Sequence, residues 1–155
     1  MKMFLKGEWA DGRKCAEVVN PYNGDTVDTV PVGTAADITP ALDGLVEGAK
    51  VMRAMPVHQR VEILRKTGRL IQNHQQELGR LISTEEGKVI AEGLIEAGRA
   101  AETFDLSADE ARNQHGETIP LDSTPGGVGK LGFTLRVPCG IVAAITPFNF
   151  PLNLV

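Results

Sequence analysis

The 155-residue sequence has little of several features that mark particular protein classes. It has only two cysteines, Cys15 and Cys139, which are too few for a disulfide framework and have no partner at metal-ligand spacing. Its three histidines, His58, His74 and His115, are scattered, so the sequence indicates no protein-bound metal. This cysteine usage favours a reducing compartment.

Long apolar runs and basic clusters are also missing. No apolar stretch approaches the ~20 residues that a membrane helix needs, and Lys2 and Lys6 enclose too short an apolar run for a signal-peptide core. Sixteen basic residues against twenty acidic ones give a net charge of -4, which offers no electrostatic footprint for nucleic acid or an anionic membrane. We therefore expect a cytoplasmic protein that has neither of those partners.

The remaining composition is that of an ordinary globular chain. Hydrophobic residues make up 42% of the sequence and charged residues 23%, which argues against disorder or a fibrous repeat. A chain of this length can bury roughly 70% of its unfolded surface. The sequence therefore allows one domain, or a domain with an appendage, around a sizeable core.

Residues 3–32 predict β-strands. Phe4-Leu5 and residues 15–19 flank Asp11-Gly12, a dipeptide that favours the positive φ of a hairpin turn. A second turn is predicted at residues 20–24, and the alternation at residues 26–30 is typical of a strand.

Four helical patterns follow. The first runs from an Asp37 cap to about Met55, and the second begins after Pro56. Asn73 is predicted to cap a third helix that Gly87 closes. The fourth, residues 88–113, has apolar positions that step by three and four, which predicts packing against other helices. Glycines inside these helices indicate close helix approach for some of them: Gly44, Gly48, Gly68, Gly79, Gly93 and Gly98.

Gly127, Gly129 and Gly132 match the dinucleotide-binding pattern GxGxxG. That pattern binds phosphate at the start of a following helix, whereas residues 133–137 predict a strand. We therefore interpret residues 117–137 as a hairpin with its turn at 123–129. A phosphate-binding loop at 127–132 is the alternative, and it would require Lys130→Ala to weaken nucleotide binding.

Residues 141–145, Ile-Val-Ala-Ala-Ile, are typical of a strand buried on both faces of a parallel sheet. Pro147 and Pro151 stiffen a turn after it, and a helix is predicted to resume at residues 152–155. Asn149 lies in this turn, beyond the carboxyl end of the strand, where α/β proteins place ligands. Its amide either caps the turn or the helix, or points into a crevice and stabilises a developing oxyanion.

The stretch from Arg136 to Leu152, R-x-P-x-G-I-V-A-A-I-T-P-F-N-F-P-L, resembles the start of the cofactor domain in the NAD(P)-dependent aldehyde dehydrogenase superfamily. The resemblance implies an α/β fold in which N-terminal β-hairpins and helices precede the first strand of a parallel cofactor-binding sheet. Weaker agreements follow the expected order at residues 19–24, 85–88 and 116–117. The resemblance divides the chain into three parts. Residues 1–115 would be the N-terminal part of the cofactor-binding domain, residues 116–137 an oligomerisation-arm hairpin, and residues 138–155 the start of the dinucleotide-binding sheet.

The resemblance also implies roles for the residues around Asn149. The Asn149 amide would donate a hydrogen bond to the oxyanion of the thiohemiacetal that forms when a cysteine attacks an aldehyde. Phe150 would face the substrate tunnel. The nicotinamide-ribose side of NAD or NADP would be lined, largely through backbone atoms, by Ile145, Thr146, Pro147 and Phe148.

In that family the nucleophilic cysteine and the general-base glutamate follow the last residue of this sequence. We therefore expect the 155 residues to be the N-terminal part of a longer enzyme, or a truncated gene product, that alone oxidises no aldehyde. The full-length enzyme would act on a small aldehyde and form a homo-oligomer, a dimer or a tetramer. The alternative is a non-catalytic oligomerisation or binding module derived from the same fold.

Overall fold

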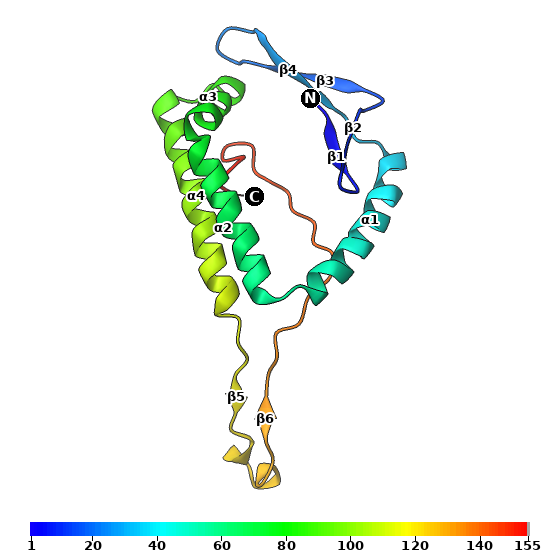
Figure 1. Ribbon diagram of the computed structural model, residues 1–155, viewed down its shortest axis with the longest axis vertical. Helices are drawn as coiled ribbons and strands as arrows, with labels where there is room; N and C mark the ends of the chain where they lie inside the picture. Colours follow the sequence, from blue (N-terminus) through cyan, green and yellow to red (C-terminus); the bar gives the residue numbers. More distant parts are fainter. Residues whose placement is uncertain (155) are drawn as a thin grey trace.

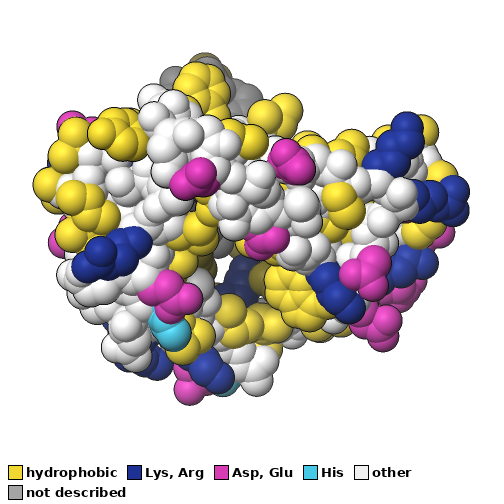
Figure 2. All heavy atoms as spheres, turned by 90° about the horizontal axis from the view of Figure 1, so that it is seen from above, with side chains coloured by type: hydrophobic (Ala, Val, Ile, Leu, Met, Phe, Trp, Pro, Cys, Tyr) yellow, Lys and Arg dark blue, Asp and Glu magenta, His cyan; other side chains and the backbone are white. Residues whose placement is uncertain are grey.

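The computed structural model describes residues 1–154. Two small β-hairpins lie at one end of its long axis, four helices form the middle, and a long hairpin projects from the other end (Figure 1). The chain then returns from that hairpin toward the helices. Seen from above, the molecule is hollowed near its centre, with hydrophobic side chains around the opening (Figure 2).

The N-terminal strands form two separate antiparallel hairpins. β1 (Met3–Leu5) pairs with β2 (Glu8–Ala10), and β3 (Cys15–Val19) pairs with β4 (Thr26–Pro31). The predicted hairpin around Asp11-Gly12 is therefore wrong, because Lys6 and Gly7, with φ of 53° and 84°, close a tighter turn directly after β1. The predicted turn at residues 20–24 is confirmed between β3 and β4.

The four predicted helices are confirmed as α1 (Ala35–Ala54), α2 (Val57–Asn73), α3 (Gln75–Glu86) and α4 (Ile90–Arg112). Two caps differ from the prediction. Thr34 precedes α1, and its backbone N–H and hydroxyl donate to Asp37 Oδ2 at 2.8 and 2.7 Å, so Asp37 completes a capping box instead of being the cap. Asn73 ends α2 instead of capping α3, because the N–H of His74 still donates to helical carbonyls of α2.

The core lies where α2 and α3 pack against α4. Its buried apolar residues come from these three helices: Val61, Ile71, Ile82, Ala97, Ala100, Ala101 and Ala108. Small residues let the helices approach closely, since a Cβ added to Gly68 would lie 3.1 Å from the Ala101 carbonyl oxygen. One added to Gly79 would lie 2.9 Å from the Leu94 backbone nitrogen. Close approach is thus confirmed for these two glycines, whereas Gly48 has open space around it.

The projecting hairpin contains β5 (Thr118–Ile119) and β6 (Gly132–Phe133), with two short 3₁₀ helices, η1 (Leu121–Ser123) and η2 (Pro125–Gly127), at its tip. The predicted hairpin is confirmed, but its strands are only two residues long. Pro120 has no N–H to extend the ladder, and the chain turns directly after it. No helix follows Gly132 within residues 133–147, so the phosphate-binding pattern lacks the element it needs.

The predicted buried strand at residues 141–145 is wrong for this structure. Residues 134–147 contain no regular strand, and the side chains of Val142 and Ile145 are 68% and 95% exposed. A strand buried on both faces needs paired neighbours, and none of the other described segments pairs with this one. Residues 151–154 form turns, and Val155, the end of the predicted helix, lies outside the described residues.

Candidate functional site

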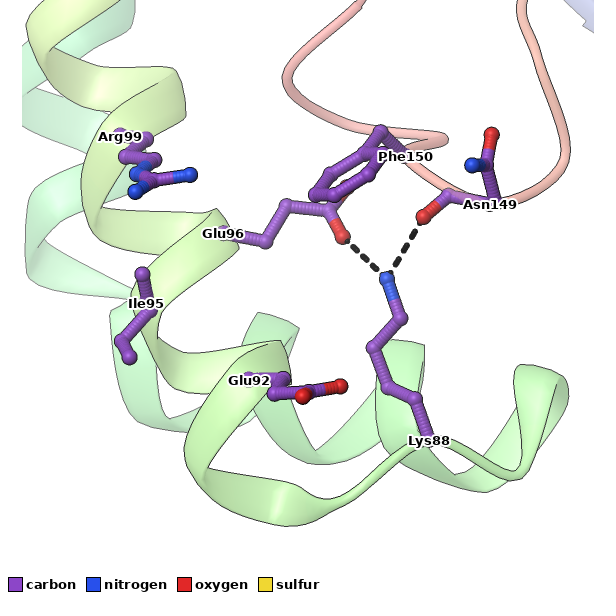
Figure 3. Close-up of a pocket in the computed structure, with 7 residues that line it drawn as sticks. All are labelled: Lys88, Glu92, Ile95, Glu96, Arg99, Asn149 and Phe150. Atoms are coloured by element: carbon purple, nitrogen blue, oxygen red, sulfur yellow. Dashed lines mark hydrogen bonds and ion pairs between the residues drawn. The ribbon is translucent and has the colours of Figure 1, made fainter.

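A network of charged groups at the start of α4 organises the candidate site (Figure 3). Gly87 ends α3 with a φ of 74°, a left-handed conformation that glycine adopts without strain. The chain reverses there, and Lys88 follows at the entry to α4. The Lys88 Nζ lies 2.9 Å from Glu86 Oε2 and 2.8 Å from Glu96 Oε2.

Glu96 is the one charged residue among the buried positions of the described chain, and its side chain is 0% exposed. Both of its oxygens have partners, because Oε2 accepts from Lys88 and Oε1 accepts from the backbone N–H of Leu152 at 3.0 Å. A buried carboxylate is costly unless it is paired and hydrogen-bonded. Both conditions are met here, so the pair fixes the local geometry.

Lys88 and Glu96 also hold the turn at residues 148–152, which follows the extended segment of residues 134–147. Lys88 also donates to the backbone carbonyl of Asn149 at 2.7 Å. The Lys88 Nζ also lies 4.6 Å from the centroid of the Phe150 ring, a cation–π distance. Further along, the Thr103 hydroxyl donates to Asn153 Oδ1 at 2.9 Å. Residues 149–153 are therefore held both by Lys88, just before α4, and by Thr103 on α4.

Burial and neighbouring charges shift the pKa values of two groups near this network, Lys88 and Glu85. Burial works to lower the pKa of Lys88, but hydrogen bonds and charges from Glu96 and Glu86 outweigh it, so this pKa lies above its ordinary value. Burial raises the pKa of Glu85, and the charges of Glu86 and Glu96 raise it further. The ammonium of Lys88 therefore stays charged in a cluster where carboxylates are in excess.

A cavity of about 430 Å³ opens beside this network. Figure 3 shows α4 on one side of it and the turn on the other, with the Asn149 side chain pointing away from Lys88. Lys88 holds Asn149 through its backbone carbonyl and does not occupy its side-chain amide. The lining residues are Lys88, Glu92, Ile95, Glu96, Arg99, Asn149 and Phe150.

The structure brings together only part of the site predicted from the sequence. Asn149 and Phe150 line the cavity. The other four predicted residues lie on the segment that leads to it, where Ile145 and Phe148 are 95% and 90% exposed. Thr146 is exposed and Pro147 half-buried.

Sequence reasoning missed Lys88 and Glu96. A signal for Glu96 was present, since it lies among the small residues Gly93, Ala97 and Ala100 on the face that α4 buries. A charge on such a helix face requires a buried partner. No comparable local pattern identifies Lys88 as that partner.

Residues 1–154 contain no group of three or more His, Cys, Asp or Glu side chains placed to hold a metal ion. Within this described range, none of the helices combines the length and apolar character that crossing a bilayer requires.

Comparison with known proteins shows that the sequence and the fold of this chain match a family of enzymes. The model of the aldehyde dehydrogenase family matches residues 9–155. A curated 3-sulfolactaldehyde dehydrogenase of Priestia aryabhattai is 38% identical over 153 residues, which are 99% of this chain and 32% of that protein. The chain thus spans about a third of the length of the curated relatives it matches.

Two solved structures share the fold over 99% of this chain. Aldehyde dehydrogenase 21 from Physcomitrella patens, in complex with the reaction product succinate, matches with a TM-score of 0.92 and 36% identity, over 32% of its own length. NADP-dependent glyceraldehyde-3-phosphate dehydrogenase from Bacillus halodurans, complexed with NADP, matches with a TM-score of 0.92 and 30% identity, over 33% of its length.

Proposed function

This chain belongs to the aldehyde dehydrogenase family, and on that premise we propose that it is the N-terminal part of an enzyme that oxidises a small aldehyde to a carboxylic acid with NAD or NADP. The family match over residues 9–155 is the observation that carries the proposal. Residues 1–115 and 138–155 would contribute to its cofactor-binding domain. The α/β fold and the two structural likenesses support this assignment.

In this proposal Asn149 stabilises negative charge. A cysteine thiolate elsewhere in the enzyme attacks the aldehyde carbon, the C=O π electrons move to oxygen, and the Asn149 amide donates a hydrogen bond to that oxyanion. Lys88 holds Asn149 through its backbone carbonyl, which leaves the side-chain amide available as a donor. One preorganised donor of this kind is worth roughly 3–4 kcal/mol. Phe150, half-buried against Lys88, would face the substrate.

The residues before Asn149 suit the nicotinamide-ribose side of NAD or NADP. Ile145 and Phe148 present exposed apolar surface that a ring can cover, and the segment around them has no β-ladder to occupy its backbone groups. The dinucleotide, when bound, accepts the hydride of the oxidation. This chain's part is to contact and orient it, through Ile145, Thr146, Pro147 and Phe148.

Residues 116–137 are suited to join subunits of a homo-oligomer, a dimer or a tetramer. The hairpin projects away from the helices (Figure 1). Apolar side chains on it are open to solvent, with Val128, Leu131 and Leu135 exposed by 71%, 81% and 72%. Large apolar side chains exposed close together in the sequence are typical of interaction sites.

A cytoplasmic location completes the proposal. Cys15 and Cys139 are both free and exposed, which suits a reducing compartment.

The test of the proposed function is Asn149→Ala in an active enzyme that contains this chain. We expect kcat to fall about 10²–10³-fold while KM changes little, because the lost hydrogen bond forms only as charge develops. Asn23→Ala, which removes an exposed amide in the turn between β3 and β4, is the matched control and should leave both constants unchanged. A decrease in kcat of less than about tenfold for Asn149→Ala would show that the asparagine only shapes its turn.

A further inference from the structure

We propose that Lys88 is a positioning residue: together with Glu96 it holds the backbone of the turn that carries Asn149, and thereby aims the amide. This inference rests on the function proposed for Asn149, and it concerns residues that do not themselves touch the reacting atoms.

The two charged side chains grip the turn on either side of Phe150. Lys88 donates to the carbonyl of Asn149 at 2.7 Å, and Glu96 accepts from the N–H of Leu152 at 3.0 Å. Both contacts are made to backbone atoms only three residues apart. They therefore fix the direction of the chain at Asn149 without occupying its side chain, which Figure 3 shows pointing away from Lys88.

The low exposure of Lys88 and Glu96 restricts movement of the turn that they contact. The side chains of Lys88 and Glu96 are 14% and 0% exposed, and they are joined to each other at 2.8 Å. A shift of the turn would leave an N–H of Lys88 and the buried Oε1 of Glu96 without these partners, and the cost is greatest at Glu96, whose side chain has no exposed surface. The pair thus penalises movement of Asn149 in either direction along the turn.

The described segments before and after the turn make no contact that could replace the hydrogen bond from Lys88 to Asn149. Upstream, residues 141–146 are exposed and have no β-partner among the described residues. Downstream, Leu152 packs against the core of Ile71, Ala100 and Ala101, and Thr103 holds Asn153. Those downstream contacts anchor the end of the turn, so the Lys88 contact is the one that acts on Asn149 itself.

The experiment replaces Lys88 in an active enzyme that contains this chain. Lys88→Met keeps most of the aliphatic stem and removes the donors, and we expect kcat to fall about 10–100-fold with KM within about threefold, since misplacement by about 1 Å can cost 10²-fold. Lys88→Arg keeps a charged donor and should recover most of the lost kcat. Lys50→Met, which removes an exposed lysine paired with Glu47 on α1, is the control and should leave kcat unchanged.

A double-mutant cycle separates positioning from general stability. If Lys88 acts through Asn149, Lys88→Met should lower kcat no further in an Asn149→Ala background, because the group it aims is gone. Additive losses in kcat would instead assign Lys88 a role independent of Asn149 and overturn the inference. Should Lys88→Met fail to fold because Glu96 is left unpaired, the double variant Lys88→Met/Glu96→Gln removes both charges. It should fold and keep the low kcat, and a kcat within twofold of wild type would overturn the inference.

Hydrogen exchange supplies a readout that does not depend on activity. In Lys88→Met the amide of Leu152 should exchange about tenfold faster than in the wild type, because the turn opens more often. If Asn149→Ala leaves kcat unchanged, the proposed function of Asn149 fails, and faster exchange would still support the grip on the turn. If Asn149→Ala lowers kcat while Lys88→Met changes neither kcat nor exchange, the positioning inference fails and the proposed function stands.

Discussion

Around Lys88 a single ammonium group is shared by more acidic partners than it can neutralise. Glu86 and Glu96 both bond to it, and Glu85 lies close enough for their charges to raise its pKa. Such an arrangement holds the cation firmly, since Lys88 donates to Glu96 and to the Asn149 carbonyl and is ion-paired with Glu86. In this arrangement the ionised form of Glu85 is disfavoured by burial and by the charges of Glu86 and Glu96.

Glu85 therefore predicts a pH-dependent effect on stability. Its pKa in the folded protein lies above the ordinary value of 4.5, mainly through burial and then through repulsion from Glu86 and Glu96. A raised carboxyl pKa means that ionisation disfavours the fold at pH above the folded value, and that this penalty disappears as pH falls below the unfolded value. Glu85→Gln should thus raise Tm at pH 7 and leave it nearly unchanged near pH 3.5.

Thermal unfolding of wild type and Glu85→Gln at both pH values measures this effect. Glu110→Gln, which changes an exposed glutamate of α4, is the matched control and should show no such difference. A Tm for Glu85→Gln at or below that of the wild type at pH 7 would contradict the interpretation.

At the residue scale the sequence pointed to Asn149 and contained a signal that Glu96 is buried, but it could not pair Glu96 or Lys88 with the turn. Asn149 stands in a local frame of prolines and aromatic residues, which a reading of neighbouring positions detects. Its contact with Lys88 joins residues 61 apart, and the contact of Leu152 with Glu96 joins residues 56 apart. No periodicity along the chain encodes such pairs, because they arise only when α4 packs beside the turn.

At the element scale, the helices were predictable and the strands were only partly so. A helix satisfies its backbone hydrogen bonds internally, so the pattern of α4 was sufficient to identify it. A strand requires a partner, and the apolar run at residues 141–145 has none in the described chain. The same dependence explains β1, which pairs across the Lys6-Gly7 turn instead of the stronger-looking Asp11-Gly12 signal.

Two helical glycines should respond in opposite ways to a methyl group. A Cβ on Gly79 would lie 2.9 Å from both the backbone nitrogen and the Cα of Leu94, so α3 and α4 would have to move apart. Gly79→Ala should therefore destabilise the fold by about 1–3 kcal/mol. A Cβ on Gly48 meets nothing within 4 Å, and Gly48→Ala should stabilise it by roughly 0.5–1 kcal/mol through helix propensity.

Denaturant unfolding of the two variants beside the wild type tests this pair. Because both changes are Gly→Ala inside helices, each serves as the control for the other. Equal shifts in the same direction would mean that propensity alone governs both sites, and that the contact between α3 and α4 tolerates expansion.

At the scale of the whole molecule, a large part of the apolar surface is exposed to solvent. The three packed helices bury a small core, while apolar side chains remain open along the projecting hairpin and the segment that returns from it. Val137, Ile145 and Phe148 are 78%, 95% and 90% exposed. Exposed apolar surface of this extent is typical of surfaces that contact further protein or a ligand.

The positions of the cysteines in the whole molecule bear on whether these 155 residues can carry out the proposed reaction alone. The lining residues of the cavity beside Asn149 include the charged residues Lys88, Glu96 and Arg99, and no cysteine is among its described lining residues. Cys15 and Cys139 are exposed and lie elsewhere, the first on β3 and the second on the returning segment. An oxyanion donor without a thiolate to create the oxyanion has nothing to stabilise.

We therefore predict that purified residues 1–155 produce no reduced nicotinamide from NAD⁺ or NADP⁺ with any of a panel of small aldehydes. The absorbance of reduced nicotinamide, followed beside a complete aldehyde dehydrogenase as positive control, measures this directly. Turnover at ordinary enzyme rates, about 1–10³ s⁻¹, would contradict the prediction. If that turnover were abolished by Cys139→Ser but not by Cys15→Ser, Cys139 would be the nucleophile, and the returning segment would have to fold against the Asn149 cavity in a way this structure does not show.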